Sequence, residues 1–360
     1  LDSMFALSDR PLNVITWVAL LSALILLGVP PVLRILLRHR SYSDCVSRLL
    51  QSLRDPVMGN HPGISIDRVV TLSRAPEMKE GWGVGDISTT LGRAYFTIPA
   101  FLQGSYDEFS ISVPLDKHQR NIALRVVTKG FTDCPSITAD FERTYYSYNR
   151  FFQTVVSKDA SQAVNFITSA LDDGNISFSN AACVHIVVET SDSGILMTRR
   201  STIVDLYPGS WSCSIEERLS EEDFSDTRPR PICRCVRRAL VQELGIESDS
   251  FALENLRILS FFLETDILGV SVCAIVRLNL DSHELEEKLN NGLMQDLEFT
   301  EYKICKLNDL GSLLYQSSAD FSELHPTTRY RIVMTMIHHF GEAEFVHRLQ
   351  EHILGNSPSD

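Results

Sequence analysis

The residues whose types and spacing could support chemistry lie between positions 183 and 280. Residues 233–244 have the pattern of a helix, and Gly245 is a typical helix end because glycine takes the left-handed cap conformation without strain. Glu243 is the acidic residue of this helix, and Glu216 and Glu217 form an acidic pair upstream of it. Carboxylates on one helical face can hold divalent cations, but such ions need several hard oxygen ligands and this helix supplies one.

Basic, aromatic and hydroxyl side chains in the same region could bind a phosphate-containing ligand. Guanidinium groups match phosphate oxygens, and aromatic faces stack on nucleobases. The candidates are Arg199, Arg200, Trp211, Ser214, Arg237 and Arg238. A structural role stays open for several of them, because helix arginines often pair with carboxylates and Trp211 could equally belong to the core.

Four strand-like segments surround these candidates. Residues 183–189 and 194–199 are two strand-like segments on either side of a turn at 191–194, which predicts an antiparallel pair of strands. Residues 256–264 and 269–280 predict two further strands after the helix. We therefore expect the candidate residues to be carried by a sheet and one helix.

This order of elements resembles the Nudix fold, and residues 238–246 are similar to the end of its signature, G-x5-E-x7-R-E-U-x-E-E-x-G-U, where U is aliphatic. The resemblance implies an α/β/α sandwich with a mixed sheet, so we expect an α+β chain. In working Nudix enzymes, three glutamates of the helix hold Mg²⁺ ions that bridge a diphosphate and activate water. Here Ala239 and Gln242 replace two of these glutamates, and Glu243 alone is kept.

These departures predict a Nudix-like cleft that has lost or much weakened hydrolysis. Glu243, Glu216 and Glu217 would then be vestiges of a catalytic site, and we expect neither a metal nor another cofactor. Mg²⁺ is implied only if the chain is an active hydrolase after all. The interpretation favours a binding protein over an enzyme.

The N-terminal segment has the pattern of a membrane helix. Residues 11–33 carry no charged side chain, and Arg34, Arg38, His39 and Arg40 follow at once. A 23-residue helix extends roughly 35 Å, enough to cross a hydrocarbon core of about 30 Å. The positive-inside rule predicts a single pass with the N-terminus outside and the body in the cytoplasm.

Composition limits the classes of partner. The chain has 33 Lys and Arg against 46 Asp and Glu, for a net charge of -13. A general nucleic-acid binder needs basic surface to neutralise phosphates, so this class is disfavoured. Eight cysteines without dense spacing suit a reducing compartment.

Outside the central region, the sequence predicts further strands and helices. Between residues 41 and 178 we expect a helix next to the membrane, strands at 68–72, 94–98, 109–113 and 122–127, the last two forming a hairpin, and helices at 139–156 and 161–171. Two helices are predicted at 332–340 and 342–354. The expected division is an anchor at 1–40, a connecting region at 41–178 and the Nudix-like domain with its C-terminal helices at 179–355.

Two motifs have no assigned role. Residues 81–86 have the glycine spacing of some phosphate loops, but no predicted strand precedes them and no Lys-Ser/Thr closes them, which favours an ordinary loop. His338 and His339 could bind metal, although neighbouring helical side chains point about 100° apart and such pairs are usually surface residues.

The whole pattern resembles the degenerate Nudix domains that follow a transmembrane segment in bacterial CBASS anti-phage systems. The residues that carry the resemblance are the charge-free segment 11–33, residues 207–217, the polar insertion after them, and residues 237–247. The resemblance implies that a cyclic di- or trinucleotide binds the body, that the chain forms a homo-oligomer on activation, and that the assembled helices disrupt the inner membrane of a bacterium.

Two alternatives from other classes stay open. One is a membrane-anchored Nudix hydrolase that acts on a nucleoside diphosphate derivative with Glu243, Glu216, Glu217 and Glu264 as its metal ligands. The other is a membrane tether that recruits a protein partner and binds no nucleotide.

Overall fold

The structure is a computed structural model. It describes residues 56–57, 61–62, 65–76, 79–113, 119–128, 136–225, 230–247, 249–291, 298–314, 321 and 323–355. The segments predicted for residues 11–33 and for the helix that follows them lie outside this part of the chain.

A mixed sheet forms the centre of the molecule. Its described strands run in the order β10-β9-β8-β13-β12-β4-β3, with β11 also paired to β8 and β14 to β9. The bounds are β3 Ser65–Ile66, β4 Val69–Arg74, β8 Cys183–Glu189, β9 Gly194–Arg200, β10 Trp211–Ser212, β11 Ile215–Arg218, β12 Leu256–Glu264, β13 Gly269–Arg277 and β14 Phe299–Lys306. β8 and β13 pair in parallel, whereas the other described pairs of this sheet are antiparallel.

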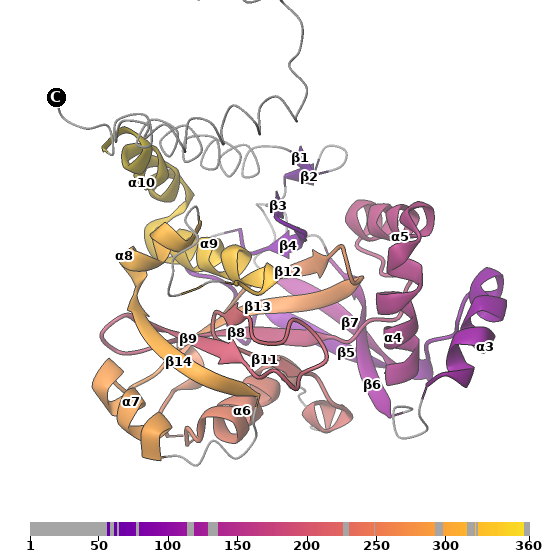
Figure 1. The fold of residues 1–360 in the computed structure, drawn as a ribbon, viewed down its shortest axis with the longest axis horizontal. Coiled ribbons are helices and arrows are strands. Elements are labelled where there is room, and N and C mark those ends of the chain that lie inside the picture. The colour runs from indigo at the N-terminus through magenta and orange to yellow at the C-terminus, as the bar shows by residue number, and fades with distance from the viewer. Residues whose placement is uncertain are drawn as a thin grey trace, which may run out of the picture.

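Helices cover both faces of this sheet. Figure 1 shows α9 on one side and α6 and α7 on the other. Their bounds, with those of neighbouring helices and short 3-10 turns, are α6 Pro231–Leu244, α7 Ser282–Asn291, α8 Leu307–Leu310, α9 Pro326–Phe340, α10 Glu342–Gly355, η4 Glu221–Phe224, η5 Leu253–Asn255 and η6 Gly311–Leu314. The sandwich thus has helix, sheet and helix layers around an apolar core.

A second, three-stranded sheet lies beside the first and carries its own helices (Figure 1). It has the order β5-β7-β6, with β5 parallel and β6 antiparallel to β7. The bounds are β5 Ile87–Tyr95, β6 Arg120–Val127, β7 Ile137–Tyr145, α3 Gln103–Ile111, α4 Tyr146–Thr154, α5 Ala160–Asp173, η1 Ala100–Leu102 and η3 Val156–Lys158; the pair β1 Pro56–Val57 and β2 His61–Pro62 stands apart. β4, from the same part of the sequence, instead joins the large sheet through β12.

Most predicted elements of the central region are confirmed. β8, β9, β12 and β13 form as strands, and α6 ends at Gly245 in the left-handed conformation, with a φ of 64°. Helices α5 and α10 also match their predictions, whereas α9 begins at Pro326, six residues before the predicted start at 332. Helices α5 and α6 follow the helical period of their apolar residues, whereas β8, β12 and β13 are buried on both faces and stand out as apolar runs of strand length.

Three predictions in the connecting region are wrong. The strand expected at 94–98 is instead β5, which ends at Tyr95, and residues 96–98 belong to no strand. Residues 109–113 do not form a strand, because Phe109 to Ile111 end helix α3, and the expected hairpin with β6 therefore does not exist. Residues 139–145 belong to strand β7 rather than to a helix, and only from Tyr146 does α4 begin. The burial of β7 alternates along much of the strand, and its aromatic residues satisfy both periods over so short a segment.

The expected fold needs correction at its N-terminal end. None of the helices in the described ranges is long and apolar enough to cross a membrane. The longest, α9, has 15 residues and spans only about 22 Å, against a hydrocarbon core of about 30 Å. The fold is therefore an α/β body with a mixed sheet, and the transmembrane helix is removed from its description. The membrane location, which depended on that helix, has no support from the described residues.

Candidate functional site

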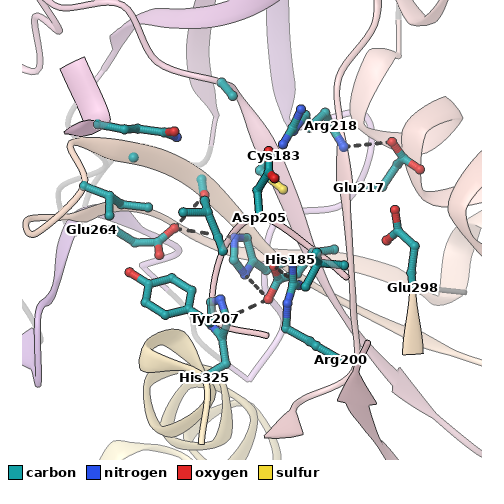
Figure 2. Close-up of a pocket in the computed structure, with 18 of the residues that line it drawn as sticks. Cys183, His185, Arg200, Asp205, Tyr207, Glu217, Arg218, Glu264, Glu298 and His325 are labelled. Carbon is teal, nitrogen blue, oxygen red and sulfur yellow. Dashed lines mark hydrogen bonds and ion pairs between the residues drawn. The ribbon is translucent and has the colours of Figure 1, made fainter. Parts of the chain in front are cut away.

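A pocket of about 480 Å³ opens where several strands of the large sheet end. The starts of β8 and β13, the ends of β9 and β12, and β11 all contribute side chains to it (Figure 2). The lining includes Cys183, His185, Arg200, Asp205, Tyr207, Glu216, Glu217, Arg218, Glu264, Glu298 and His325. Its size falls within the roughly 300–1,000 Å³ of small-molecule sites.

Glu216 on β11 is the electrostatic centre of the pocket. Arg331 of α9, a fully buried residue, donates from Nη2 to Glu216 Oε1 at 2.7 Å, and Arg200 of β9 donates from Nη1 to Oε2 at 2.8 Å. Burial opposes the charge of this carboxylate, but the cationic forms of His325 and His185, together with Arg200 and Arg331, outweigh it and hold the pKa of Glu216 well below its ordinary value. Both oxygens of Glu216 are therefore already engaged by guanidinium groups.

Two histidines lie against the same carboxylate. His185 Nδ1 is 3.4 Å and His325 Nδ1 is 3.7 Å from Glu216 Oε1. Burial lowers the pKa of both rings, and that of His325 falls to about 3. At neutral pH these rings are uncharged, so the positive charge beside Glu216 comes from the two arginines.

Glu264, at the end of β12, behaves differently from Glu216. Burial first, and then the negative charges of Glu216 and Asp266, raise its pKa to about 8. Its Oε1 lies 3.7 Å from His185 Nε2 and accepts a hydrogen bond from Ser271 Oγ at 3.4 Å. At pH 7 Glu264 is mainly a neutral acid that can donate a hydrogen bond.

Glu243 of α6 also favours its protonated form. Burial, followed by the charges of Glu298 and Glu217, raises its pKa well above the ordinary value. Its Oε1 is buried and has no hydrogen-bond partner among the described residues. Glu217 is held instead by Arg238, at 2.8 Å, so no cation is left to pair with Glu243 in this part of the structure.

The residues of α6 do not fit the magnesium ions of Nudix enzymes. Ala239 is fully buried one turn before Glu243 on the same face, and Gln242 is exposed. Within the described ranges, no group of three or more His, Cys, Asp or Glu side chains is placed to hold a metal ion. Hard cations need several oxygen ligands, and this helix supplies one carboxylate.

The structure brings four of the sequence candidates into the pocket. Arg200, Glu216, Glu217 and Glu264 line it, and Glu243 lies close enough for the charges of Arg200, Glu216 and Glu217 to act on it. Arg238 does not line the pocket, but contacts Glu217 and the buried Asp223 at 2.8 and 2.9 Å. Arg238 therefore holds strand β11 against helix α6.

The other candidates are placed elsewhere. Arg199 pairs with Glu301 at 2.6 Å on the outer face of β9. Trp211 is buried and packs edge-on against Phe321. Ser214 is also buried and accepts a hydrogen bond from the amide of Val188 at 3.0 Å. The side chain of Arg237 is exposed on α6, outside the lining of the pocket.

Several pocket residues were missed by the sequence reasoning. His185 lies within an apolar strand, His325 precedes α9, and Arg331 is on the buried face of that helix. Polar residues inside apolar segments were a usable signal, since such residues are seldom buried without a partner. Their convergence on Glu216 was not visible, because 115 positions separate Glu216 from Arg331.

Comparisons with known proteins give fold similarity without a family assignment. No family model matches the chain, and no curated protein matches its sequence. Among solved structures, a Nudix hydrolase from Alicyclobacillus acidocaldarius is similar at 11% identity and a TM-score of 0.33, over 44% of this chain and 92% of its own. A Deinococcus radiodurans protein is similar at 14% identity and a TM-score of 0.29, over 42% of this chain and 80% of its own. A bifunctional NMN adenylyltransferase/ADP ribose pyrophosphatase from Francisella tularensis is similar at 13% identity and a TM-score of 0.27, over 50% of this chain and 46% of its own.

Nudix hydrolases are thus among the solved structures to which this chain is similar, as the sequence resemblance predicts. The similarity is weak and covers about half of the chain. The function proposed below therefore depends on the residues of the pocket and, for the identity of the ligand, on the sequence resemblance of residues 207–217 and 237–247.

Proposed function

We propose that the pocket binds a nucleotide-derived ligand without hydrolysing it, and that the chain acts as a sensor of this ligand. The proposal rests on how the acidic residues of the pocket are neutralised, by arginines or by protons. Glu216 is neutralised by Arg200 and Arg331, Glu264 and Glu243 favour a bound proton, and Ala239 stands where a metal carboxylate would be needed. A site arranged in this way holds its carboxylates without a metal ion.

The polarity of the pocket limits how such a ligand would lie. Two arginines line the pocket, Arg200 and Arg218, against a larger set of acidic side chains. Asp205, Glu217 and Glu298 offer acceptors that suit the amino groups of a base and the hydroxyls of a sugar. We place the phosphate near Arg218, whose exposed guanidinium lies 5.2 Å from the Tyr146 ring centre. The base and sugar would then enter the acidic interior.

Within this class, a cyclic di- or trinucleotide is our proposed ligand, and homo-oligomerisation is the proposed response in bacterial anti-phage defence. The support for this finer proposal is the sequence resemblance of residues 207–217 and 237–247. The pocket adds one criterion, which is a base with an exocyclic amino group. Adenine should therefore bind better than hypoxanthine, because the amino donor is lost in hypoxanthine and an acceptor replaces it.

The experiment is thermal-shift screening of the full chain against mononucleotides and cyclic di- and trinucleotides, in adenine and hypoxanthine forms. The expected result is a rise in melting temperature with an adenine-containing compound and a smaller rise with its hypoxanthine analogue. Arg218→Gln should weaken binding by about tenfold, through loss of one charge-assisted contact. Arg93→Gln, an exposed arginine remote from the lining, is the matched control.

Three outcomes would count against parts of this proposal. Failure of every nucleotide to raise the melting temperature would overturn binding and favour a tether for a protein partner. Magnesium-dependent release of phosphate that Glu243→Gln abolishes would overturn the non-hydrolytic function and establish the hydrolase alternative. Nucleotide binding without an increase in the particle mass measured by light scattering would contradict only the proposed oligomerisation.

A further inference from the structure

A second cavity, of about 950 Å³, lies at the opposite end of the parallel strands β8 and β13. The first pocket takes Cys183 and Ser271 from the starts of these strands, whereas the second takes Glu189 and Arg277 from their ends. Six strand residues separate Ser271 from Arg277, which corresponds to roughly 20 Å. The two cavities are therefore separate sites.

The basic side chains of the second cavity are not neutralised. Arg257 donates to the backbone carbonyls of Glu254 and Leu256, and Arg277 donates to the carbonyl of Ser191 at 2.7 Å. No carboxylate pairs with Arg257, Arg277, Arg230 or Lys79 in the part of the chain that the structure describes. Four carboxylates also line the cavity, those of Glu80, Asp86, Glu189 and Glu254, but none of them forms an ion pair with these four basic groups among the described residues. The basic groups can therefore still pair with an anion.

The glycine-containing loop of residues 81–86 forms one wall of this cavity. Gly81 has a φ of +64°, and a Cβ there would lie 3.0 Å from Arg257 Cβ, so glycine lets the loop pack directly against this arginine. The nearby Asp86 accepts a hydrogen bond from the amide of Gly83 at 2.8 Å. Its carboxylate is therefore engaged by the loop and does not neutralise Arg257.

Glu189, at the end of β8, supplies a buried acceptor to the same cavity. The residue is 3% exposed, and its Oε2 lies 3.4 Å from Nε2 of His339, near the end of α9. Its other oxygen, Oε1, is buried and has no hydrogen-bond partner among the described residues. A buried carboxylate oxygen without a donor is costly, so a ligand with a hydroxyl or amino donor would complete it.

We propose that this second cavity binds an organic phosphate that also carries free hydroxyl groups. The phosphate would contact the guanidinium groups of Arg257 and Arg277, and a hydroxyl would donate to Glu189 Oε1. Guanidinium groups bind phosphate oxygens through charge-assisted hydrogen bonds, and a hydroxyl is the donor that the carboxylate lacks. The proposal uses none of the residues that line the first pocket and does not depend on the function assigned to it.

The test is calorimetric titration of the full chain with ribose 5-phosphate as the probe, and with inorganic phosphate and ribose as separate arms. Ribose 5-phosphate should bind more tightly than either component. Arg277→Gln should weaken its binding by about tenfold, whereas Arg93→Gln and Arg218→Gln should leave it unchanged. Arg277 is exposed, so this substitution leaves the folded core intact.

The Glu189→Gln variant tests the proposed hydroxyl contact separately from the phosphate contact. It should weaken the binding of ribose 5-phosphate while leaving that of inorganic phosphate within twofold, because only the sugar uses this acceptor. No saturable binding of ribose 5-phosphate, or equal binding by the Arg277→Gln and Arg93→Gln variants, would overturn the proposal. Loss of binding in Arg218→Gln alone would assign the probe to the first pocket and equally overturn it.

Discussion

Replacement of Arg331 by methionine should destabilise the protein more than any exposed arginine replacement on the same helix. Arg331 is completely buried, and its Nη2 donates to Glu216 Oε1 at 2.7 Å and to Ser212 Oγ at 2.6 Å. Removing one partner of a buried ion pair costs about 3–5 kcal/mol, because the remaining charge stays buried without compensation. Arg200 still contacts Glu216, at 2.8 Å, so we expect the lower end of this range.

The matched control is Arg329→Met. Arg329 lies on the same helix and pairs with Asp67 at 3.1 Å, but both side chains are partly exposed, and such pairs are worth about 0–1 kcal/mol. Urea unfolding at pH 7, followed by fluorescence, gives both free energies. A loss in Arg331→Met no larger than in Arg329→Met would refute the assignment of Arg331 as the counter-charge of Glu216.

Two further predictions concern proton binding and backbone conformation. The pKa of Glu264 rises from its usual 4.5 to about 8 on folding, so the stability it contributes is full below pH 4.5 and is lost as the pH rises to 8. Glu264→Gln should therefore stabilise the protein relative to wild type at pH 9 but not at pH 4.5. The gain should be about 1.4 kcal/mol for each pH unit between the two pKa values, and urea unfolding measures it. An equal effect at both pH values would contradict the raised pKa. Gly174→Ala should cost more than Gly245→Ala, since both glycines have φ near 65° but only at Gly174 would a Cβ collide with the carbonyl of Val127. Gly245→Ala should lose about 1 kcal/mol from the left-handed conformation alone, and equal melting temperatures for the two variants would exclude the collision.

The sequence predicted those parts of the fold in which local pattern and tertiary environment agree. α5 and α6 have an apolar face of helical period and end at glycines in the left-handed conformation, so their length and limits follow from the chain alone. β7 could not be predicted in this way, because Phe141 and Tyr145 satisfy both the helical and the strand period. The neighbouring strands β5 and β6 decide the outcome, and they come from distant positions.

The candidate site was predictable for acidic residues in or near the signature helix and for Arg200 on β9. Glu243 and Glu217 were found because they stand in or near a recognisable motif. Arg199 and Arg200 are adjacent in sequence but point to opposite faces of β9, so one pairs with Glu301 and the other enters the pocket. Which of the two enters depends on the register of the strand in the sheet, and the sequence does not contain that information.

Glu216, Glu243 and Glu264 are buried or half-buried at the pocket, and the surrounding chain must compensate their charge. Buried carboxylates carry the full cost of desolvation unless protons or basic side chains neutralise them. Both solutions are present: Glu243 and Glu264 take up protons, and Arg331 reaches from α9 to Glu216. Because Arg331 occupies the space beside Glu216 Oε1, restoring a glutamate at position 239 alone would not restore a metal site. The buried Arg331 and the protons favoured on Glu243 and Glu264 therefore make the pocket a surface of fixed hydrogen-bond donors and acceptors.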